Sequence, residues 1–191
     1  LPRGVSEGTA LDFAREKEMW LRKHLSQRSV DVPIRFGVQV PVEGILREIA
    51  PGTGRRVRAT GDRIEIPGPE ARAGVRLAAW LKELARDRLV SASDRYAAQL
   101  GRPYSQISLR DTRSRWGSCS AQGRLMYSWR LIMAPPDALD YVAAHEVAHL
   151  QEMNHSPAFW AVVARLRPDY DEHRLWLRRE GADLHRYRFA D

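Results

Sequence analysis

The sequence predicts an α+β fold, in which small antiparallel sheets pack with helices. Two patterns lead to this class. In several short segments apolar residues alternate with other residues, which is the period of a strand. In longer segments apolar residues recur every three to four positions, which is the period of a helix with one buried face.

The predicted strands form two groups. Alternation over residues 34–40 indicates the first strand, and Pro41 limits its extension. Gly61-Asp62 is expected to turn the chain between two of the strands that follow. In the first group these are residues 45–49, 55–60 and 63–66, and in the second group the strands are residues 106–111 and 124–131.

Helices are predicted on both sides of the second strand group. A long helix over residues 70–100 would turn Leu77, Leu81, Leu84 and Leu89 inward and end at Gly101. Pro and an acidic residue in the first turn, or Ser as N-cap before Pro, mark the later helix starts. The other predicted helices are residues 8–27, 136 to about 153, 156–167 and 168–179.

The composition excludes several classes of protein. The chain has 191 residues, of which 43% are hydrophobic, and this share is too high for a disordered chain. No uninterrupted apolar run approaches the roughly 18 residues of a membrane-spanning helix, so no membrane partner is predicted. The single Cys119 cannot form an internal disulfide, and no signal peptide is apparent. We therefore expect a cytoplasmic protein, whose oligomeric state the sequence leaves open.

The candidate metal-ligating and catalytic residues lie in the sequence His145-Glu146-Val147-Ala148-His149. Four residues turn a helix by about 400°, so the two histidines project from one face, where they can share a tetrahedral zinc ion. Glu146 lies about 100° away, close enough to reach a water molecule on the metal. Apolar neighbours indicate that this helix is buried, and buried imidazoles without partners would be costly. The pattern favours one zinc ion over a pair of solvent-facing histidines.

His155 is the best candidate for a third zinc ligand. On a continuous helix it would lie about 240° round from His149, so the chain must leave the helix first. Asn154 tolerates the left-handed conformation that ends helices, and Ser156 begins a new helix at once. A carboxylate from Asp171 or Glu172 is the alternative third ligand. The spacing also matches the metzincin pattern, but Glu152 replaces its Gly and no Met follows Met153.

Four blocks of sequence resemble the YgjP-like metallopeptidase domain of bacteria, which is similar to the SprT and WLM zinc peptidases. These blocks lie in residues 113–120, 129–131, 141–150 and 154–160, and the resemblance is close over about residues 70–188. One departure is Ser128, where Asn is expected before the Trp. The resemblance implies a zincin-like fold, with His145, His149 and His155 on zinc and Glu146 as the catalytic acid and base.

The break at Pro67-Gly68-Pro69 suggests two domains. Residues 1–66 would form an N-terminal helix with a strand-rich subdomain, and residues 67–191 the zincin-like metallopeptidase domain. Family members carry strands before the first helix, and the opening residues 1–4 look like the end of such a strand. We therefore expect the chain to begin inside the domain.

The expected reaction is hydrolysis of a peptide or protein substrate. Zinc would lower the pKa of its water and polarise the scissile carbonyl, while Glu146 would pass a proton to the leaving amine. A strand such as residues 124–131, at a sheet edge, could hold an extended peptide. An oxyanion donor is also expected, and the candidates are Tyr127, Arg113, Arg115, Tyr170 and His173.

Two further features suggest other functions. Residues 102–130 carry six Arg against one acid, Asp111, so the chain could instead bind DNA or cleave DNA-bound proteins. Cys119 is either a buried apolar residue or a thiolate that reaches the zinc or senses oxidants. A metal-stabilised scaffold without turnover is a third reading.

Overall fold

The structure is a computed structural model that describes residues 6–8, 11–12 and 30–189. The chain divides into two compact units, residues 1–31 and residues 32–191. The helix predicted over residues 8–27 lies almost entirely outside the described residues. The division predicted at residue 66 stays a prediction.

The described part of the second unit contains short strands, four α-helices and three 3-10 turns. In chain order the strands are β1 (Val32–Pro33), β2 (Gln39–Val42), β3 (Ile45–Gly52), β4 (Arg58–Thr60), β5 (Arg63–Pro67), β6 (Gln106–Arg110), β7 (Gly117–Cys119), β8 (Arg124–Ser128) and β9 (Tyr187–Arg188). The helices are α3 (Ala73–Leu100), α4 (Pro136–Ala148), α5 (Pro157–Leu166) and α6 (Tyr170–Glu180). The 3-10 turns are η1 (Glu70–Arg72), η2 (Trp129–Met133) and η3 (Gly181–His185).

The strands of residues 30–189 form three small sheets. One has four strands in the order β2-β3-β5-β4, one has three in the order β6-β8-β7, and β1 pairs with β9. The predicted α+β class is confirmed, but the expectation of antiparallel sheets is only partly right. The pairs β3–β5, β6–β8 and β1–β9 are parallel. Alternation identifies a strand and its buried face, but carries no information about the direction of its neighbour.

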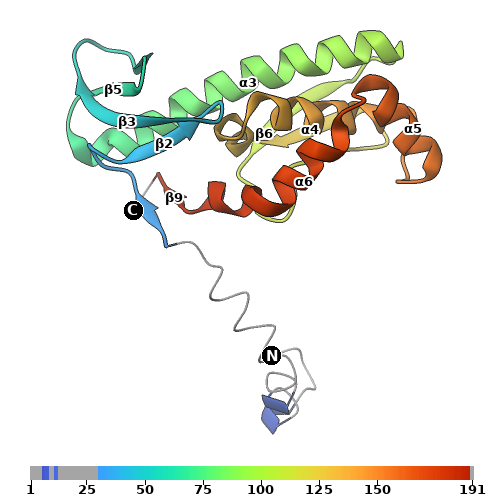
Figure 1. Cartoon of the computed structure of the whole chain (residues 1–191), viewed down its shortest axis with the longest axis horizontal. Helices are drawn as coiled ribbons and strands as arrows, with labels where there is room; N and C mark the ends of the chain where they lie inside the picture. The colour runs from blue at the N-terminus through green and yellow to red at the C-terminus, as the bar shows by residue number, and fades with distance from the viewer. Residues whose placement is uncertain (1–5, 9–10, 13–29, 190–191) are drawn as a thin grey trace. The chain divides into compact units, whose positions relative to one another are not determined.

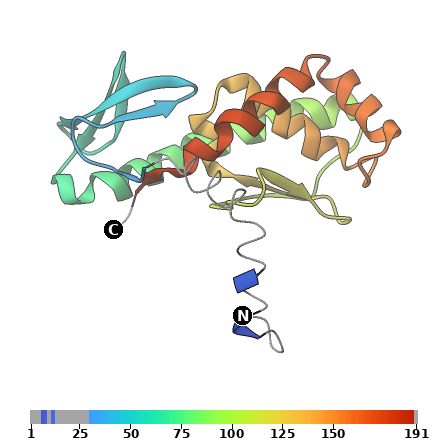
Figure 2. The ribbon, with the colours of Figure 1, turned by 60° about the horizontal axis from the view of Figure 1, so that its bottom comes forward.

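Helix α3 links the two larger sheets. Figures 1 and 2 show it running from the β2–β5 sheet at one end towards the layer of α4, α5 and α6 at the other. Three of its four predicted inward leucines, Leu77, Leu81 and Leu89, are fully buried, whereas Leu84 is half-buried and Ala85 takes the inner position. Gly101 ends the helix in the left-handed conformation, as predicted.

Several element boundaries differ from the sequence prediction. Pro41 lies inside β2 rather than limiting a strand over residues 34–40, and the edge position of β2 tolerates its missing N–H. The strand predicted over residues 124–131 ends at Ser128, where η2 begins. Gly61-Asp62 forms the predicted turn between β4 and β5, which pair antiparallel.

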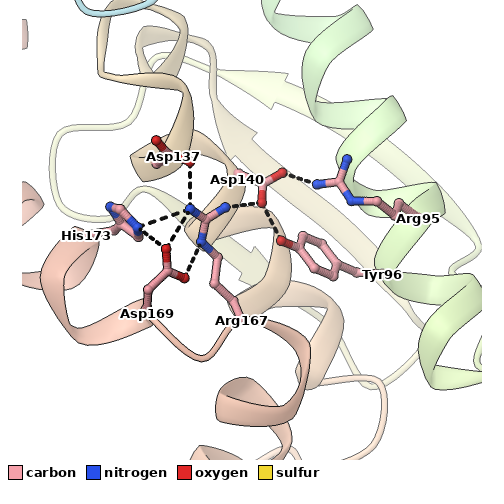
Figure 3. Close-up of polar contacts among 7 residues, drawn as sticks. All are labelled: Arg95, Tyr96, Asp137, Asp140, Arg167, Asp169 and His173. Carbon is pink, nitrogen blue, oxygen red and sulfur yellow. Dashed lines mark hydrogen bonds and ion pairs between the residues drawn. The ribbon is translucent and has the colours of Figure 1, made fainter.

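A polar network ties α4 to its neighbours. It joins the side chains of Arg95, Tyr96, Asp137, Asp140, Arg167, Asp169 and His173 (Figure 3). Arg167, in the connection from α5 to α6, donates to Asp140 and, at 2.7 Å, to Asp137 on α4. Its Nε lies 3.0 Å from Asp169. Asp140 also accepts from Arg95 and Tyr96 on α3, so one carboxylate connects α3, α4 and the α5–α6 connection.

None of the helices in the described part of the chain combines the length and the apolar character needed to cross a membrane.

Candidate metal centre and substrate pocket

Three imidazoles meet at the C-terminal end of α4. His145 lies in the last turn of α4, and His149 directly follows its last residue. The rings of these two residues are 5.1 Å apart between centroids. The ring of His155, from the corner between α4 and α5, lies 5.0 Å from that of His145 and 4.8 Å from that of His149. One nitrogen from each ring lies within 4.8 Å of the others, which is close enough for a shared metal ion.

The corner that carries His155 is built differently from the prediction. Helix α4 ends at Ala148 rather than near Met153, and the N–H of Glu152 closes the last turn on Ala148 O at 3.0 Å. Asn154 does not adopt the left-handed conformation, because Glu43 is the only described non-glycine residue with a positive φ. The Ser156 N–H instead donates to Asn154 O at 2.7 Å, and Ser156 caps α5 as predicted.

Hydrogen bonding orients one of the rings. His149 Nδ1 lies 3.0 Å from the carbonyl oxygen of Glu152, which can only accept, so Nδ1 carries the proton. The Nε2 lone pair of His149 is therefore free for a metal ion. The Nε2 atoms of His145 and His155 face each other at 3.1 Å. Two nitrogens bound to one tetrahedral zinc ion at usual bond lengths would be about 3.3 Å apart.

Aromatic side chains surround the three imidazoles. Phe159 stacks on His149 with a centroid distance of 4.4 Å, and Trp160 stacks on His155 at 5.9 Å. Burial, together with the nearby His149, His155 and Arg174, lowers the pKa of His145 to about 3. Burial also lowers the pKa of His149, although its hydrogen bond to Glu152 opposes the shift. Both rings are thus neutral at physiological pH, the form in which imidazole binds a metal.

The donor set suits zinc. Three neutral imidazoles and one open position form a ligand set of catalytic zinc sites. Within the described residues, no carboxylate or thiolate joins this group of three histidines. The alternative ligands Asp171 and Glu172 lie in the first turn of α6, outside the group.

Glu146 lies beside the imidazoles and is held against β7. Glu146 is 5% exposed, and a Cβ atom added to Gly117 would lie 2.5 Å from Glu146 Oε1. The close approach of the β7 backbone to the carboxyl is possible because residue 117 has no side chain. Burial raises the pKa of the Glu146 carboxyl to about 8, although the charge of Arg115 opposes the shift.

A pocket of about 470 Å³ opens in front of this cluster. Its walls come from three parts of the chain: β7 with the two residues before it, helix α4 with the following corner, and helix α6. The lining residues are Arg115, Trp116, Gly117, Ser118, Cys119, Tyr141, Val142, His145, Glu146, His149, Met153, His155, Arg174, Leu177 and Arg178. The size and the mixture of apolar and convergent polar groups are typical of a ligand site.

The strand at this pocket is β7, not the predicted strand over residues 124–131. Strand β8 is the central strand of its sheet, so its backbone is paired on both sides. Within the described residues, β7 pairs with β8 alone. The carbonyl of Trp116 accepts a hydrogen bond from the N–H of Ser128, and the N–H of Ser120 donates one to the carbonyl of Arg124. Antiparallel pairing alternates, so the N–H and C=O groups of Gly117 and Cys119 are directed away from β8.

The candidate oxyanion donors separate into two groups. Of the five predicted from sequence, Arg115 lines the pocket. Tyr127 is fully buried against Ser93, and His173 belongs to the Arg167 network. The other two, Arg113 and Tyr170, are not part of the lining.

Several pocket residues with polar groups have no role assigned from the sequence, among them Ser118 of β7. Arg174 and Arg178 come from α6, and Tyr141 comes from α4. Arg174 lies close enough to lower the pKa of His145, and both arginines lower the pKa of Tyr141, although burial outweighs them and raises it to about 12. The spacing of Arg174 and Arg178, one helical turn apart, is visible in the sequence, but the docking position of α6 is not.

A model of the family described as "YgjP-like, metallopeptidase domain" matches residues 1–180. The chain belongs to the YgjP-like family. The resemblance seen in the sequence is therefore confirmed, and this YgjP-like chain carries a metallopeptidase domain. The crystal structure of the metallopeptidase zymogen of Pyrococcus abyssi abylysin is similar, at 19% identity and a TM-score of 0.43, over 48% of this chain and 95% of that chain. No curated protein matches the chain.

Three remaining sequence features of the YgjP-like chain have defined surroundings. Cys119 is half-buried in the pocket wall, and burial together with Glu146 raises the pKa of its thiol to about 11. Ser128, where Asn was expected, buries a hydroxyl that has no hydrogen-bond partner among the described residues. Arg130 is buried and bound to Asp111, so it does not contribute to the exposed charge of the basic segment.

Proposed function

We propose that this YgjP-like chain is a zinc-dependent peptidase, in which His145, His149 and His155 hold one zinc ion and Glu146 is the general base and acid. The observation that supports it best is the convergence of three imidazole nitrogens within 4.8 Å beside a buried carboxyl that is not one of the group. A bound zinc ion would supply a Lewis acid that polarises the scissile carbonyl and makes water a nucleophile near neutral pH.

The proposed role of Glu146 is proton transfer. A carboxyl whose pKa is raised to about 8 can take a proton from the attacking water and release it to the leaving amine within the same catalytic cycle. Gly117 holds the β7 backbone against this carboxyl and so limits its rotation. Arg115 and Tyr141 both line the pocket and can donate a hydrogen bond to the developing oxyanion.

The substrate is proposed to bind as an extended peptide along β7. The outward N–H and C=O groups of Gly117 and Cys119 offer main-chain hydrogen bonds, as in other cases of strand addition. Main-chain pairing positions a peptide without reading its side chains, so it suits a peptidase that cuts within chains. A cytoplasmic location stays a prediction, for which the single cysteine is the supporting feature.

Metal content and cleavage, measured on the same protein, test the proposal. Purified wild-type chain should contain one zinc per chain and cleave an unstructured protein such as casein. Glu146→Gln should retain the zinc but lose activity by about 10²–10⁴-fold, the usual contribution of a general base. Glu180→Gln, the same change at an exposed residue of α6, should leave activity unchanged. A zinc-loaded wild type that cuts no peptide would refute the peptidase proposal and favour the reading as a metal-stabilised scaffold without turnover.

The DNA-associated alternative has one supporting observation. Five of the six arginines in the basic segment are exposed, and they form no ion pair with any described carboxylate; they are Arg102, Arg110, Arg113, Arg115 and Arg124. Free surface arginines of one sign are a footprint of phosphate binding. This alternative predicts binding to duplex DNA that weakens steeply with salt. Unchanged gel mobility of DNA at low salt would refute it.

A further inference from the structure

The walls of the pocket carry more positive charge than the proposed reaction requires. Arg115 leads into β7, and Arg174 and Arg178 lie one turn apart on α6. Glu146 is the only carboxylate among the lining residues. With a divalent ion on the three histidines, these groups would sum to a formal charge of about +4 around a single small cavity.

The guanidinium of Arg174 packs on an indole and has only a distant carboxylate partner. Its Cζ lies over the ring of Trp160, 4.4 Å from the ring centroid. The nearest carboxylate oxygen, Oδ1 of Asp171, is 3.6 Å from Nη1, which is beyond hydrogen-bond distance. Packing on an indole fixes a guanidinium but leaves the N–H groups at its edge free to donate.

Arg115 and Arg178 have no ion-pair partner among the described carboxylates. This contrasts with Arg130 and Arg167, whose guanidinium groups bind Asp111 and three aspartates respectively. In the pocket, the half-buried Arg174 has only the longer ion pair of 3.6 Å to Asp171, and Arg115 and Arg178 have none.

We infer that the pocket selects peptides that carry a carboxylate near the bond to be cut, and that Arg174 and Arg178 are the residues that bind it. The inference rests on the proposed peptidase function and names its substrate class. Guanidinium groups match carboxylates through paired, charge-assisted hydrogen bonds. The same field disfavours Lys and Arg side chains on the substrate, because like charges would meet in a confined space. The carboxylate can come from an internal Asp or Glu, or from the C-terminus of the peptide.

Binding to a variant that cannot turn over tests the inference directly. The probe is a set of fluorescein-labelled peptides added to zinc-loaded full-length Glu146→Gln, with fluorescence anisotropy as the readout. The peptides share one sequence, and a single Gln is replaced in turn by Glu or Lys, each with an amidated C-terminus. A fourth peptide keeps Gln and has a free C-terminus. The Glu peptide, the free-acid peptide or both should bind at least about tenfold more tightly than the amidated Gln peptide.

The outcome for the four peptides is unambiguous. A gain for the Glu peptide assigns an acidic side chain as the ligand, and a gain for the free-acid peptide assigns the C-terminal carboxylate. Weaker binding of the Lys peptide supports the same charge preference. Equal affinity for all four peptides, within a factor of about two, would overturn the inference.

Three arginine variants on α6 identify the residues responsible. Arg174→Gln and Arg178→Gln should each remove most of the carboxylate preference, while the amidated Gln peptide binds as before. Arg178 is exposed, so its variant tests the inference even if loss of the Trp160 contact unfolds Arg174→Gln. Arg179→Gln removes the same charge from an exposed residue outside the pocket and should keep the preference. If Arg179→Gln lowers the preference equally, net charge is responsible and the inference fails.

Cleavage of the same peptides by the wild type separates this inference from the proposed function. A protein that cuts the peptides without preferring a carboxylate is a peptidase, and the inference alone is wrong. A protein that binds the carboxylate peptides selectively but cuts none of them is not a peptidase, and the selective pocket is retained.

Discussion

Two clusters of charged side chains flank α4, and they differ in whether their arginines have close carboxylate partners. In the Arg167 network every nitrogen of the guanidinium has a carboxylate oxygen within 3.2 Å, and Asp140 accepts from three donors (Figure 3). In the pocket, Arg115 and Arg178 have no described carboxylate partner, and Arg174 has only a distant one. Each region also keeps one buried nitrogen without a hydrogen-bond partner among the described residues, which is His145 Nδ1 in the pocket and Arg167 Nε in the network.

The difference separates structure from function. An arginine with no close carboxylate can pair with a charged group on a ligand, whereas one that is already paired cannot do so without losing its partner. The ion-paired network joins α3, α4 and the connection from α5 to α6, and the pocket on the same frame presents arginines that a ligand can pair with.

The largest loss of stability should come from Arg167→Met. It leaves Asp140, whose side chain is 18% exposed, without its buried partner, and breaking such a pair costs about 3 kcal/mol. The matched change Arg178→Met removes an arginine that has no carboxylate partner and should change the free energy of unfolding by less than about 0.5 kcal/mol. Urea denaturation of both variants measures the contrast. Equal losses in the two variants would show that the clusters do not differ energetically.

Zinc should stabilise the chain by nearly as much. A ligand at 100 times its dissociation constant adds about 2.7 kcal/mol to the free energy of unfolding when it binds only the folded state. Thermal melts of the chelator-treated protein, with and without added zinc, measure this gain. His155→Ala should melt at the same temperature in both conditions, because two histidines bind zinc too weakly. A gain in His155→Ala equal to that of the wild type would place the ion elsewhere.

Gly117→Ala should have a smaller effect, of about 2 kcal/mol, because the new methyl group overlaps Glu146 Oε1. A double-mutant cycle isolates this contact. In the background of Glu146→Ala, which removes the overlapping atoms, the same Gly117→Ala change should cost almost nothing. Denaturation of the four proteins gives the coupling energy. An unchanged cost in both backgrounds would mean that Gly117 is required for a reason unrelated to the carboxyl.

Local patterns in the sequence were sufficient for much of this picture. The three-to-four spacing of apolar residues located α3, and the spacing of His145 and His149 followed from helix geometry alone. The N-cap at Ser156 was equally local, because one side chain and the next Pro define it. Such features depend on a few neighbouring residues, and the tertiary structure did not override them.

Features that depend on packing between distant segments were predicted poorly. Nothing in the sequence indicates that α6 brings Arg174 and Arg178 to the pocket, since helix periodicity fixes a face but not its partner. The order of strands in a sheet is likewise not visible in the sequence. We expected β8 at the edge of its sheet, but β7 occupies that edge and β8 is central. The corner at His155 was predicted through Asn154, whereas the structure turns earlier, after Ala148.

The smallest predicted effect concerns a third arginine, Arg130, whose partner Asp111 is half-exposed. Burial alone would raise the pKa of the Asp111 carboxyl, but hydrogen bonds and charge from Arg130 outweigh it and lower that pKa below its usual 3.8. The ionised form is therefore favoured in the folded state. The resulting stability is present above about pH 4 and is lost as the pH falls through the folded-state pKa.

Asp111→Asn should therefore lower the free energy of unfolding by only about 1 kcal/mol near neutral pH, because solvent screens a half-exposed carboxylate. The difference between this variant and the wild type should shrink as the pH falls below about 4, because the wild-type carboxyl is protonated first in the unfolded state and then, at lower pH, in the folded state. Urea denaturation of both proteins over this pH range measures it. Asp87→Asn, at an exposed position of α3, should show no difference at any pH. A difference for Asp111→Asn that grows as the pH falls would mean that Arg130 does not stabilise the charged form.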